Sequence, residues 1–214
     1  MICLSKNKKD VFINRFAKGS NLPIQDYDEP IPDGPILIRS IAKKLLIRER
    51  WKTGKPFYYM DSGYFGNYKS RANPNGWKLW HRIVKNDLQH SEIKERPDDR
   101  WKRLDIELKF NNYGGRHILL VLPSEKPCKF YGIDLDEWTE QTIHEIKRHT
   151  DRPIVVRAKG TRGERLKNTI WQDLEKCHAM VTYQSIAAVE SVIAGVPAFT
   201  LAPTAADPVC DKDL

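Results

Sequence analysis

The chain has 214 residues, 40% of them hydrophobic, which is enough to bury the core of one large domain or two small ones and excludes an intrinsically disordered protein. It has no apolar run of about 18 residues and no signal-peptide core near its start, so we expect neither a membrane span nor secretion and predict a cytoplasmic protein. Its four scattered cysteines form no C-x-x-C pair, which argues against a disulfide framework and a zinc knuckle.

The first half predicts a βαβ unit. Residues 11–16, VFINRF, are a strand candidate, and a loop rich in Pro and Asp follows at residues 21–35. Apolar residues at helical spacing predict a helix over residues 36–51, and residues 57–60 predict the next strand. That strand leads directly into Asp61, at the carboxyl edge where open α/β sheets place ligands.

Residues 73–112 are rich in charge and in Trp, and they predict loops with short strands. The sequence NNYGG at residues 111–115 has the composition of a linker, and the charge balance changes there. We therefore predict two domains, a basic one over residues 1–114 and a second over residues 115–214.

The charge of the two halves differs although the formal total is only +8. Residues 1–115 contain 23 Lys and Arg against 14 Asp and Glu, a charge of +9, whereas residues 116–214 contain 13 against 14, a charge of −1. Tryptophans lie beside basic residues in the segments 77–82 and 100–103, which suits a polyanionic partner. The alternative is that Lys and Arg solvate helix faces while Trp fills the core.

The second half alternates strands and helices more clearly. Residues 117–122, HILLVL, predict a strand buried on both faces, followed by a loop at residues 123–127. An amphipathic helix at 136–149, a strand at 153–157, a short helix at 169–177 and a strand at 180–183 follow in order. This order predicts a parallel sheet with right-handed crossovers.

The segment 180–201, MVTYQSIAAVESVIAGVPAFTL, predicts a strand, a turn, a short helix that ends at Gly195 and a second strand. Ser185 occupies the expected N-cap of this helix, where unpaired N–H groups and the positive end of the helix dipole favour a phosphate. The alternative is an ordinary βαβ unit with an ordinary cap.

Polar residues gather after the carboxyl ends of the strands in this half. Arg157 and Lys159 can neutralise a diphosphate that Ser185 and the following N–H groups cap, and Glu190 lies one helical turn further on. The segments that converge at this edge also include Thr182 and Thr200. The predicted nucleotide-binding residues are Ser124, Arg157, Lys159, Gln184, Ser185, Ile186 and Glu190.

Residues 116–201 resemble the nucleotide-sugar-binding half of glycosyltransferases with the GT-B architecture, in which a Ser at a helix start, a helix Glu and a Gly-Val-Pro turn recur. Here these are Ser185, Glu190 and Gly195-Val196-Pro197. The resemblance implies an α/β fold of two Rossmann-like parallel-sheet domains and a nucleotide-sugar donor, with Ser185 at its phosphates and Glu190 at a ribose or sugar hydroxyl. A solvent-facing Glu190 is the alternative.

Only 13 residues follow Leu201, whereas the second domain of such enzymes normally continues with more helix. We therefore expect either a missing tail or a reduced, GT-B-like fold.

The segments 61–66 and 80–82 loosely resemble acceptor-side parts of capsule-type and bacteriophage sugar transferases. An inverting sugar transfer needs a base near the acceptor hydroxyl. Asp61 is the first candidate and is expected to face the cleft between the domains, with His81 and His90 as the next candidates. The alternatives are an Asx-turn role for Asp61 and simple packing against tryptophans for His81.

The basic first half favours DNA as the acceptor, because bacteriophage transferases of this architecture glycosylate hydroxymethylated pyrimidines. Exposing a base suits aromatic wedges, and the predicted nucleic-acid residues are Tyr64, Trp77 and Arg82. The alternatives are a nucleotide- or nucleic-acid-binding module without turnover and a capsule or lipopolysaccharide transferase. We expect no metal site, because the histidines are dispersed and Asp134-Leu135-Asp136 suits a helix cap.

Overall fold

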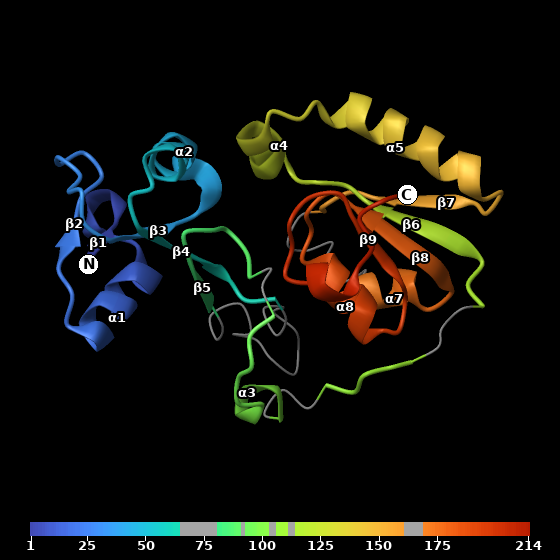
Figure 1. Cartoon of the computed structure of the whole chain (residues 1–214), viewed down its shortest axis with the longest axis horizontal. Coiled ribbons are helices and arrows are strands. Elements are labelled where there is room, and N and C mark those ends of the chain that lie inside the picture. The colour runs from blue at the N-terminus through green and yellow to red at the C-terminus, as the bar shows by residue number, and fades with distance from the viewer. Residues whose placement is uncertain (65–80, 91–92, 103–105, 111–113, 161–168) are drawn as a thin grey trace. The chain divides into compact units, whose positions relative to one another are not determined.

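The structure is a computed structural model that describes residues 1–64, 81–90, 93–102, 106–110, 114–160 and 169–214. It divides into two compact units: the first comprises the described residues of Met1–Gly63 and Trp80–Leu88, and the second those of Tyr64–Leu79 and Gln89–Leu214. Each unit has its own sheet of mainly parallel strands with helices packed on it (Figure 1). The predicted class, α/β with two Rossmann-like sheets, is therefore confirmed.

The sheet of the first unit has the strand order β2-β1-β3-β4-β5. Its first four strands pair in parallel, whereas β5 runs antiparallel to β4, so that one strand departs from the predicted parallel sheet. The elements are β1 (Ile2–Leu4), η1 (Lys6–Lys8), α1 (Val11–Ser20), β2 (Ile24–Gln25), β3 (Ile36–Arg39), η2 (Ile41–Lys43), α2 (Lys44–Thr53), β4 (Phe57–Ser62) and β5 (His81–Lys85).

The predicted strand at residues 11–16 is wrong, because this segment opens the helix α1. Asp10 caps the helix: its Oδ1 accepts hydrogen bonds from the N–H groups of Phe12 at 3.0 Å and Ile13 at 3.1 Å. Ile13 and Ala17, four residues apart, form the buried stripe that faces the sheet. The first strand is instead the short apolar run of β1.

The predicted helix at residues 36–51 is half wrong. Ile36, Leu37 and Ile38 are fully buried and form β3, and the helix α2 begins only at Lys44. A short, continuously apolar run in a parallel sheet has no alternation, so it cannot be distinguished by periodicity from the start of a helix. Between the two elements the chain turns at Ser40, which adopts a left-handed backbone with φ +77.

The second unit contains a four-stranded, fully parallel sheet in the order β7-β6-β8-β9. Its predicted strands and its long helix are confirmed within a few residues, but the predicted loop at 123–127 contains the start of a helix, α4. The elements are α3 (Asp99–Lys102), β6 (His117–Val121), α4 (Glu125–Tyr131), α5 (Leu135–His149), β7 (Ile154–Arg157), α7 (Ile170–Leu174), β8 (Cys177–Thr182), α8 (Ala187–Ile193), β9 (Ala198–Thr200) and η4 (Asp207–Val209).

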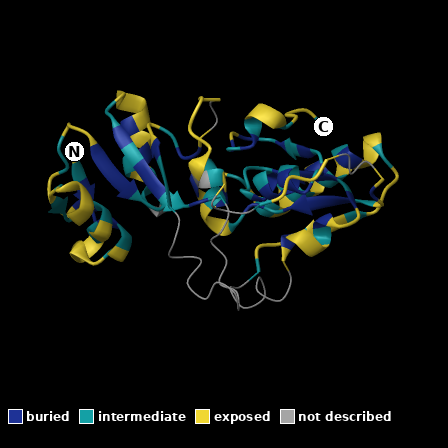
Figure 2. Cartoon of the chain, turned by 90° about the horizontal axis from the view of Figure 1, so that it is seen from below, coloured by how far each residue is buried: buried dark blue, intermediate teal, exposed yellow. Residues whose placement is uncertain are grey.

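β6 is the central strand of the second unit and is buried on both faces, as predicted. Leu119 and Val121 pack with residues of α7 and α8, whereas Ile118 and Leu120 pack with Ile146 of α5 on the opposite face. In Figure 2 the strands are accordingly dark, while the helices show exposed outer faces. Helices therefore cover both faces of the sheet, and the loops that follow its strands lie at its carboxyl edge.

The boundary predicted at residue 114 lies inside the second unit, between α3 and β6. Part of the preceding segment contacts α8, because the Lys109 N–H donates to the Ile193 carbonyl at 2.9 Å. A Cβ on Gly195, which has φ +74, would lie 2.7 Å from the Lys109 carbonyl oxygen. Glycine therefore ends α8 at the predicted place, and its lack of a side chain leaves room for the backbone of Lys109.

No helix in the described part of the chain is both long and apolar enough to cross a membrane.

Candidate functional site

The sheet order of the second unit reverses beside β6, because the chain passes from β6 to β7 on one side and then to β8 on the other. In open α/β sheets, ligands bind where the loops after two such strands diverge. The loop after β6 carries Ser124, and the loop after β8 carries Gln184 and Ser185. Three residues predicted to bind nucleotide thus lie at the carboxyl edge that flanks the reversal.

Side chains join the loop after β8 to α4 and α5. Gln184 Nε2 donates to the hydroxyl of Tyr131, at the end of α4, over 2.5 Å. The Tyr131 ring meets the Tyr183 ring edge-on, with 5.5 Å between their centroids. The Trp138 ring of α5 also meets the Tyr183 ring edge-on, with 6.1 Å between centroids. Aromatic faces beside the turn at which a phosphate is predicted suit a planar base or a sugar ring.

Tyr131 was not among the predicted site residues, because a loop was predicted at residues 123–127 and no helix was predicted after it. Pro127 argued for a loop at this position, although proline is tolerated in the first turn of a helix, where its missing N–H needs no partner. Gly132 follows the helix in a left-handed conformation with φ +73. A glycine directly after an apolar pair, Phe130-Tyr131, was the available indication of a helix end.

Ser185 caps α8, but from one residue before the N-cap position, which Ile186 occupies. The Ser185 Oγ accepts from the Ala187 N–H at 3.1 Å, and the Ser185 carbonyl accepts from the Ala188 N–H at 3.2 Å. Two N–H groups of the first turn are therefore already used within the chain. A phosphate at this turn has to replace the Ser185 hydroxyl on Ala187 or bind beside it.

Arg157 lies at the carboxyl end of β7, where it was predicted, but it forms an ion pair with Asp173 of α7. The side chains are 19% and 30% exposed, so the pair is largely withdrawn from solvent. Arg157 thus already shares its charge with a carboxylate, and its role in neutralising a diphosphate stays a prediction. Lys159 lies two residues further on and is exposed.

Glu190 is 2% exposed, so the alternative of a solvent-facing helix residue is wrong. It lies on α8 between the two core positions Ala187 and Ile193. A carboxylate is rarely buried unless a hydrogen-bond donor or an opposite charge accompanies it. Its contact with a ribose or sugar hydroxyl stays a prediction.

In the first unit, Asp61 lies at the carboxyl end of β4. Its Oδ2 accepts from the Tyr59 hydroxyl at 2.7 Å, its Oδ1 accepts from the Ser62 N–H at 2.8 Å, and Arg82 Nη2 lies 3.8 Å from Oδ2. Burial, and then the neighbouring Asp61, raise the pKa of Tyr59, which keeps its hydroxyl a donor. These contacts fix the orientation of a carboxylate whose side chain is still 37% exposed.

His81 opens β5 directly opposite Ser62. Its ring packs on Phe12, with 4.1 Å between centroids, and among the described residues nothing hydrogen-bonds its buried Nε2. Desolvation, followed by the charge of Arg39, lowers the pKa of His81 below its usual 6.5, against the opposing effects of Asp61 and Asp10. A neutral imidazole with an unpartnered nitrogen can accept a proton.

The lowered pKa of His81 predicts a loss of stability on mild acidification. The unfolded chain takes up the histidine proton near pH 6.5, but the folded chain takes it up only at lower pH. The contribution of the neutral His81 ring to the free energy of unfolding is therefore complete above pH 6.5 and is lost as the pH falls through the pKa of the folded state. Thermal unfolding between pH 7.5 and 5 should show a smaller decline for His81→Phe, which retains an aromatic ring against Phe12 but cannot titrate. An equal decline in both proteins would refute this assignment.

The predicted nucleic-acid residues Tyr64 and Arg82 each have contacts within their own unit. Arg82 is 10% exposed, and its guanidinium donates to the carbonyls of Leu88, at 3.3 Å, and Ser62. These bonds use part of the guanidinium within the first unit, and a contact of Arg82 with nucleic acid stays a prediction. Tyr64 and His90 contact each other, with the Tyr64 hydroxyl accepting from the His90 N–H at 2.9 Å, and Trp77 lies outside the described residues.

Asp134 caps α5 as expected, accepting from the N–H groups of Asp136 and Glu137 at 3.0 Å each. Within the part of the chain that the structure describes, no three His, Cys, Asp or Glu side chains are grouped as metal ligands.

Comparison with known proteins gives a likeness of fold. No protein-family model matches the sequence, and no curated protein matches it. A solved structure described as Thermosulfurimonas dismutans KpsC, beta Kdo 2,4 transferase, is similar with a TM-score of 0.53 and 12% sequence identity, over 93% of this chain and 78% of that one. At this identity the likeness extends to the fold alone.

Proposed function

We propose that this chain is a glycosyltransferase that moves a sugar from a nucleotide sugar to an acceptor hydroxyl. The observation that carries the proposal is the grouping of Ser124, Gln184 and Ser185 at the point where the order of the second sheet reverses. The fold likeness to a sugar transferase supports it independently.

The donor diphosphate is proposed to bind at the first turn of α8. The backbone there carries the positive end of the helix dipole, and Ser185 supplies a hydroxyl. Lys159 adds positive charge beside this edge, while the Arg157–Asp173 pair contributes little net charge. The departing diphosphate would be stabilised chiefly by backbone N–H groups and Lys159.

The base is proposed to be Asp61, with Tyr59 and Arg82 as positioning residues. Both contact Oδ2 of the carboxylate, and the partial exposure of the Asp61 side chain leaves room for an acceptor hydroxyl to reach it. His81 is the alternative base, because its pKa favours the neutral ring. Either group would take the proton as the acceptor oxygen attacks the sugar carbon and the diphosphate leaves.

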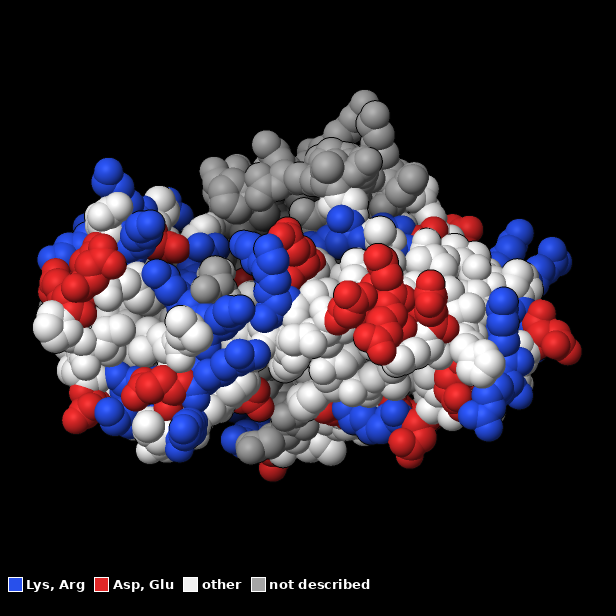
Figure 3. Space-filling model, turned by 90° about the horizontal axis from the view of Figure 1, so that it is seen from above, with Lys and Arg blue, Asp and Glu red and all other residues white. Residues whose placement is uncertain are grey.

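A glycan is the acceptor that the fold likeness favours, since the similar structure is described as a Kdo transferase. Hydroxymethylated DNA remains a second candidate on one observation, the charge of +9 over residues 1–115. Acidic side chains lie among the basic ones in the view of Figure 3, so that view shows no continuous basic face. A nucleic-acid-binding module without turnover would bind DNA with steep salt dependence and consume no donor.

The donor site is tested by thermal unfolding with a panel of nucleotide sugars. A ligand at about 100 times its Kd adds about 2.7 kcal/mol to the free energy of unfolding, and Ser185→Glu should abolish this gain by placing a carboxylate beside the phosphates. Glutamate is tolerated at a helix start, so the variant should fold.

Ser185→Ala is the matched control: it loses one capping bond, worth about 1 kcal/mol, but keeps most of the ligand effect. A protein that no nucleotide or nucleotide sugar stabilises would refute the proposal. Transfer assays with an oligosaccharide and with hydroxymethylated DNA then separate the two acceptors.

A further inference from the structure

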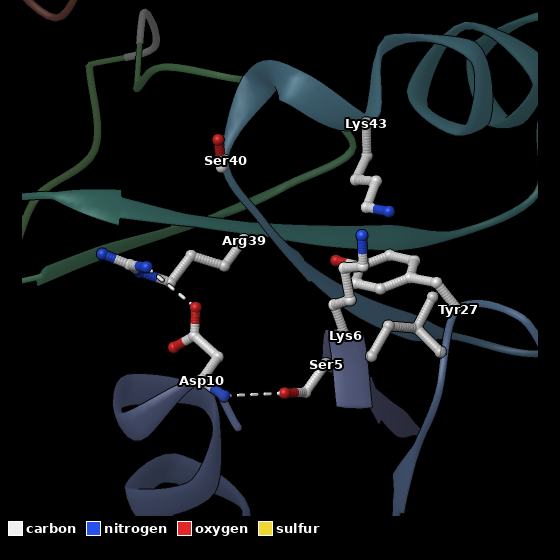
Figure 4. A pocket seen from close by; sticks show the side chains of 8 residues that line it. Ser5, Lys6, Asp10, Tyr27, Arg39, Ser40 and Lys43 are labelled. Carbon is white, nitrogen blue, oxygen red and sulfur yellow. Dashed lines mark hydrogen bonds and ion pairs between the residues drawn. The ribbon is translucent and has the colours of Figure 1, made fainter. Parts of the chain in front are cut away.

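The first unit contains a pocket of ≈ 290 Å³ at the carboxyl ends of β1 and β3 (Figure 4). The order of this sheet reverses between the two strands, because β1 leads through α1 to β2 on one side, and β3 lies on the other. The pocket therefore occupies the position at which open α/β sheets bind ligands. It is formed entirely by residues of the first unit.

Positive charge dominates the lining. Lys6, Arg39 and Lys43 face a single carboxylate, Asp10, which gives the lining a formal charge of +2. Asp10 is already compensated: its Oδ2 accepts from Arg39 Nη1 at 2.8 Å, while its Oδ1 caps α1. The two lysine ammonium groups are therefore the charges left for a ligand.

Both ammonium groups belong to the lining of the same small pocket. Lys43 Nζ lies 3.9 Å from the centroid of the Tyr27 ring, and Figure 4 shows the Lys6 side chain reaching toward the same ring from the opposite wall. Like charges directed into one small space repel each other, and an anion between them removes that cost. Ser5, 1% exposed, accepts from the Asp10 N–H at 2.9 Å and still has a hydroxyl hydrogen to donate.

We propose that this pocket binds a phosphomonoester group, held mainly by Lys6 and Lys43. Such a group carries a charge of about −1.5 to −2 at neutral pH, which matches the lining. Lysine binds phosphate as a point charge and needs no planar partner. Ligand pockets range from about 300 to 1,000 Å³, so this one holds a phosphate with at most a sugar ring and excludes a polymer from its interior.

The pocket is linked to the proposed base. The Arg39 guanidinium carbon lies 4.4 Å from the centroid of the Phe12 ring, and His81 packs on the same ring. Because adjacent strands are about 4.8 Å apart, Asp61 on β4 lies roughly one to two strand spacings from the pocket. If the proposed sugar transfer holds, on which this step rests, the phosphate belongs to the acceptor.

The test uses the full chain with Ser185→Glu, which removes phosphate binding at the donor edge. Inorganic phosphate and glucose 6-phosphate are titrated, and the amide resonances of Ser40 and Lys43 are followed by NMR. Lys6→Gln and Lys43→Gln should each weaken binding about tenfold, the effect of losing one charge-assisted contact. Lys18→Gln, in the last turn of α1, is the charge-matched control and should leave the affinity unchanged.

Tighter binding of glucose 6-phosphate than of phosphate, lost in the same two variants, supports a phosphorylated sugar as the ligand. Equal affinity supports recognition of the phosphate group alone. Affinity no higher than that for acetate, or the same loss in Lys18→Gln, overturns the proposal. Donor binding is measured separately on the protein with Ser185 intact, so a failure of the phosphate pocket and a failure of the proposed function give different results.

Discussion

Replacement of Arg50 by alanine should lower the free energy of unfolding by about 3–5 kcal/mol. The Arg50 side chain is 2% exposed, and its Nη1 donates to the carbonyls of Asp33 at 3.2 Å and Gly34 at 3.0 Å. Its Nη2 donates to the carbonyl of Pro32. Alanine removes three charge-assisted bonds at once and leaves a cavity under α2. Urea unfolding of the full chain, followed by tryptophan fluorescence, measures the loss.

Arg50 acts on the sheet through the loop it holds. Pro35, directly after the three carbonyls, accepts from the Ile2 N–H at 3.0 Å and so begins the pairing of β1 with β3. Lys52→Ala, on an exposed part of the same helix, should change stability by no more than about 0.5 kcal/mol. Arg50→Lys should lie between the two, because one ammonium cannot span three carbonyls. A loss of stability in Arg50→Ala as small as that in Lys52→Ala would show that the loop keeps its conformation without the hydrogen bonds of Arg50.

Asp61→Asn should lower the kcat of sugar transfer by about 10²- to 10⁴-fold, the usual contribution of a general base. Asparagine has nearly the same shape and can still accept from Tyr59, so the fold should be retained while the capacity to take a proton is lost. Initial rates at saturating donor and acceptor measure the effect, and a thermal unfolding curve of the variant confirms that it is folded.

Asp28→Asn, in an exposed loop of the same unit, is the control and should keep the wild-type rate. His81→Gln separates the two candidate bases. If Asp61→Asn retains the rate and His81→Gln loses it, the base is His81, and the acid limb of the rate profile should lie below pH 6.5. If both variants keep the rate, the base is neither residue.

The second unit could be predicted well from the sequence because each element is long or distinctly patterned. β6 is apolar at every position and is buried on both faces, and α5 is a 15-residue amphipathic helix with an Asp134 cap. The turn into α8 was placed to within one residue. The pairing of Arg157 with Asp173 could not be predicted, because it joins a strand end to a helix across 16 residues of chain.

The first unit was harder because its strands are short. β1 has three residues, too few to show a period, and β3 is an apolar run that extends smoothly into helical sequence. Asp61 was found because it follows a β-rich run, but its partners Tyr59 and Arg82 depend on the pairing of β4 with β5. The pocket for which we propose a phosphate ligand could not be predicted, since Lys6 and Lys43 line one pocket only after β1 and β3 have become neighbours.

The antiparallel pairing of Ser62 with His81 has a consequence for how this protein can diversify. The chain leaves the sheet at Ser62 and re-enters it at His81, the position directly opposite, so the register of β4 and β5 is set by the pairing of the strands and not by the length of the insertion between them. Doubling the length of such an insertion costs only about 0.6 kcal/mol in closure entropy. A change in the length of this insertion would therefore leave Asp61 in register with the side chains of Tyr59 and Arg82 that contact it.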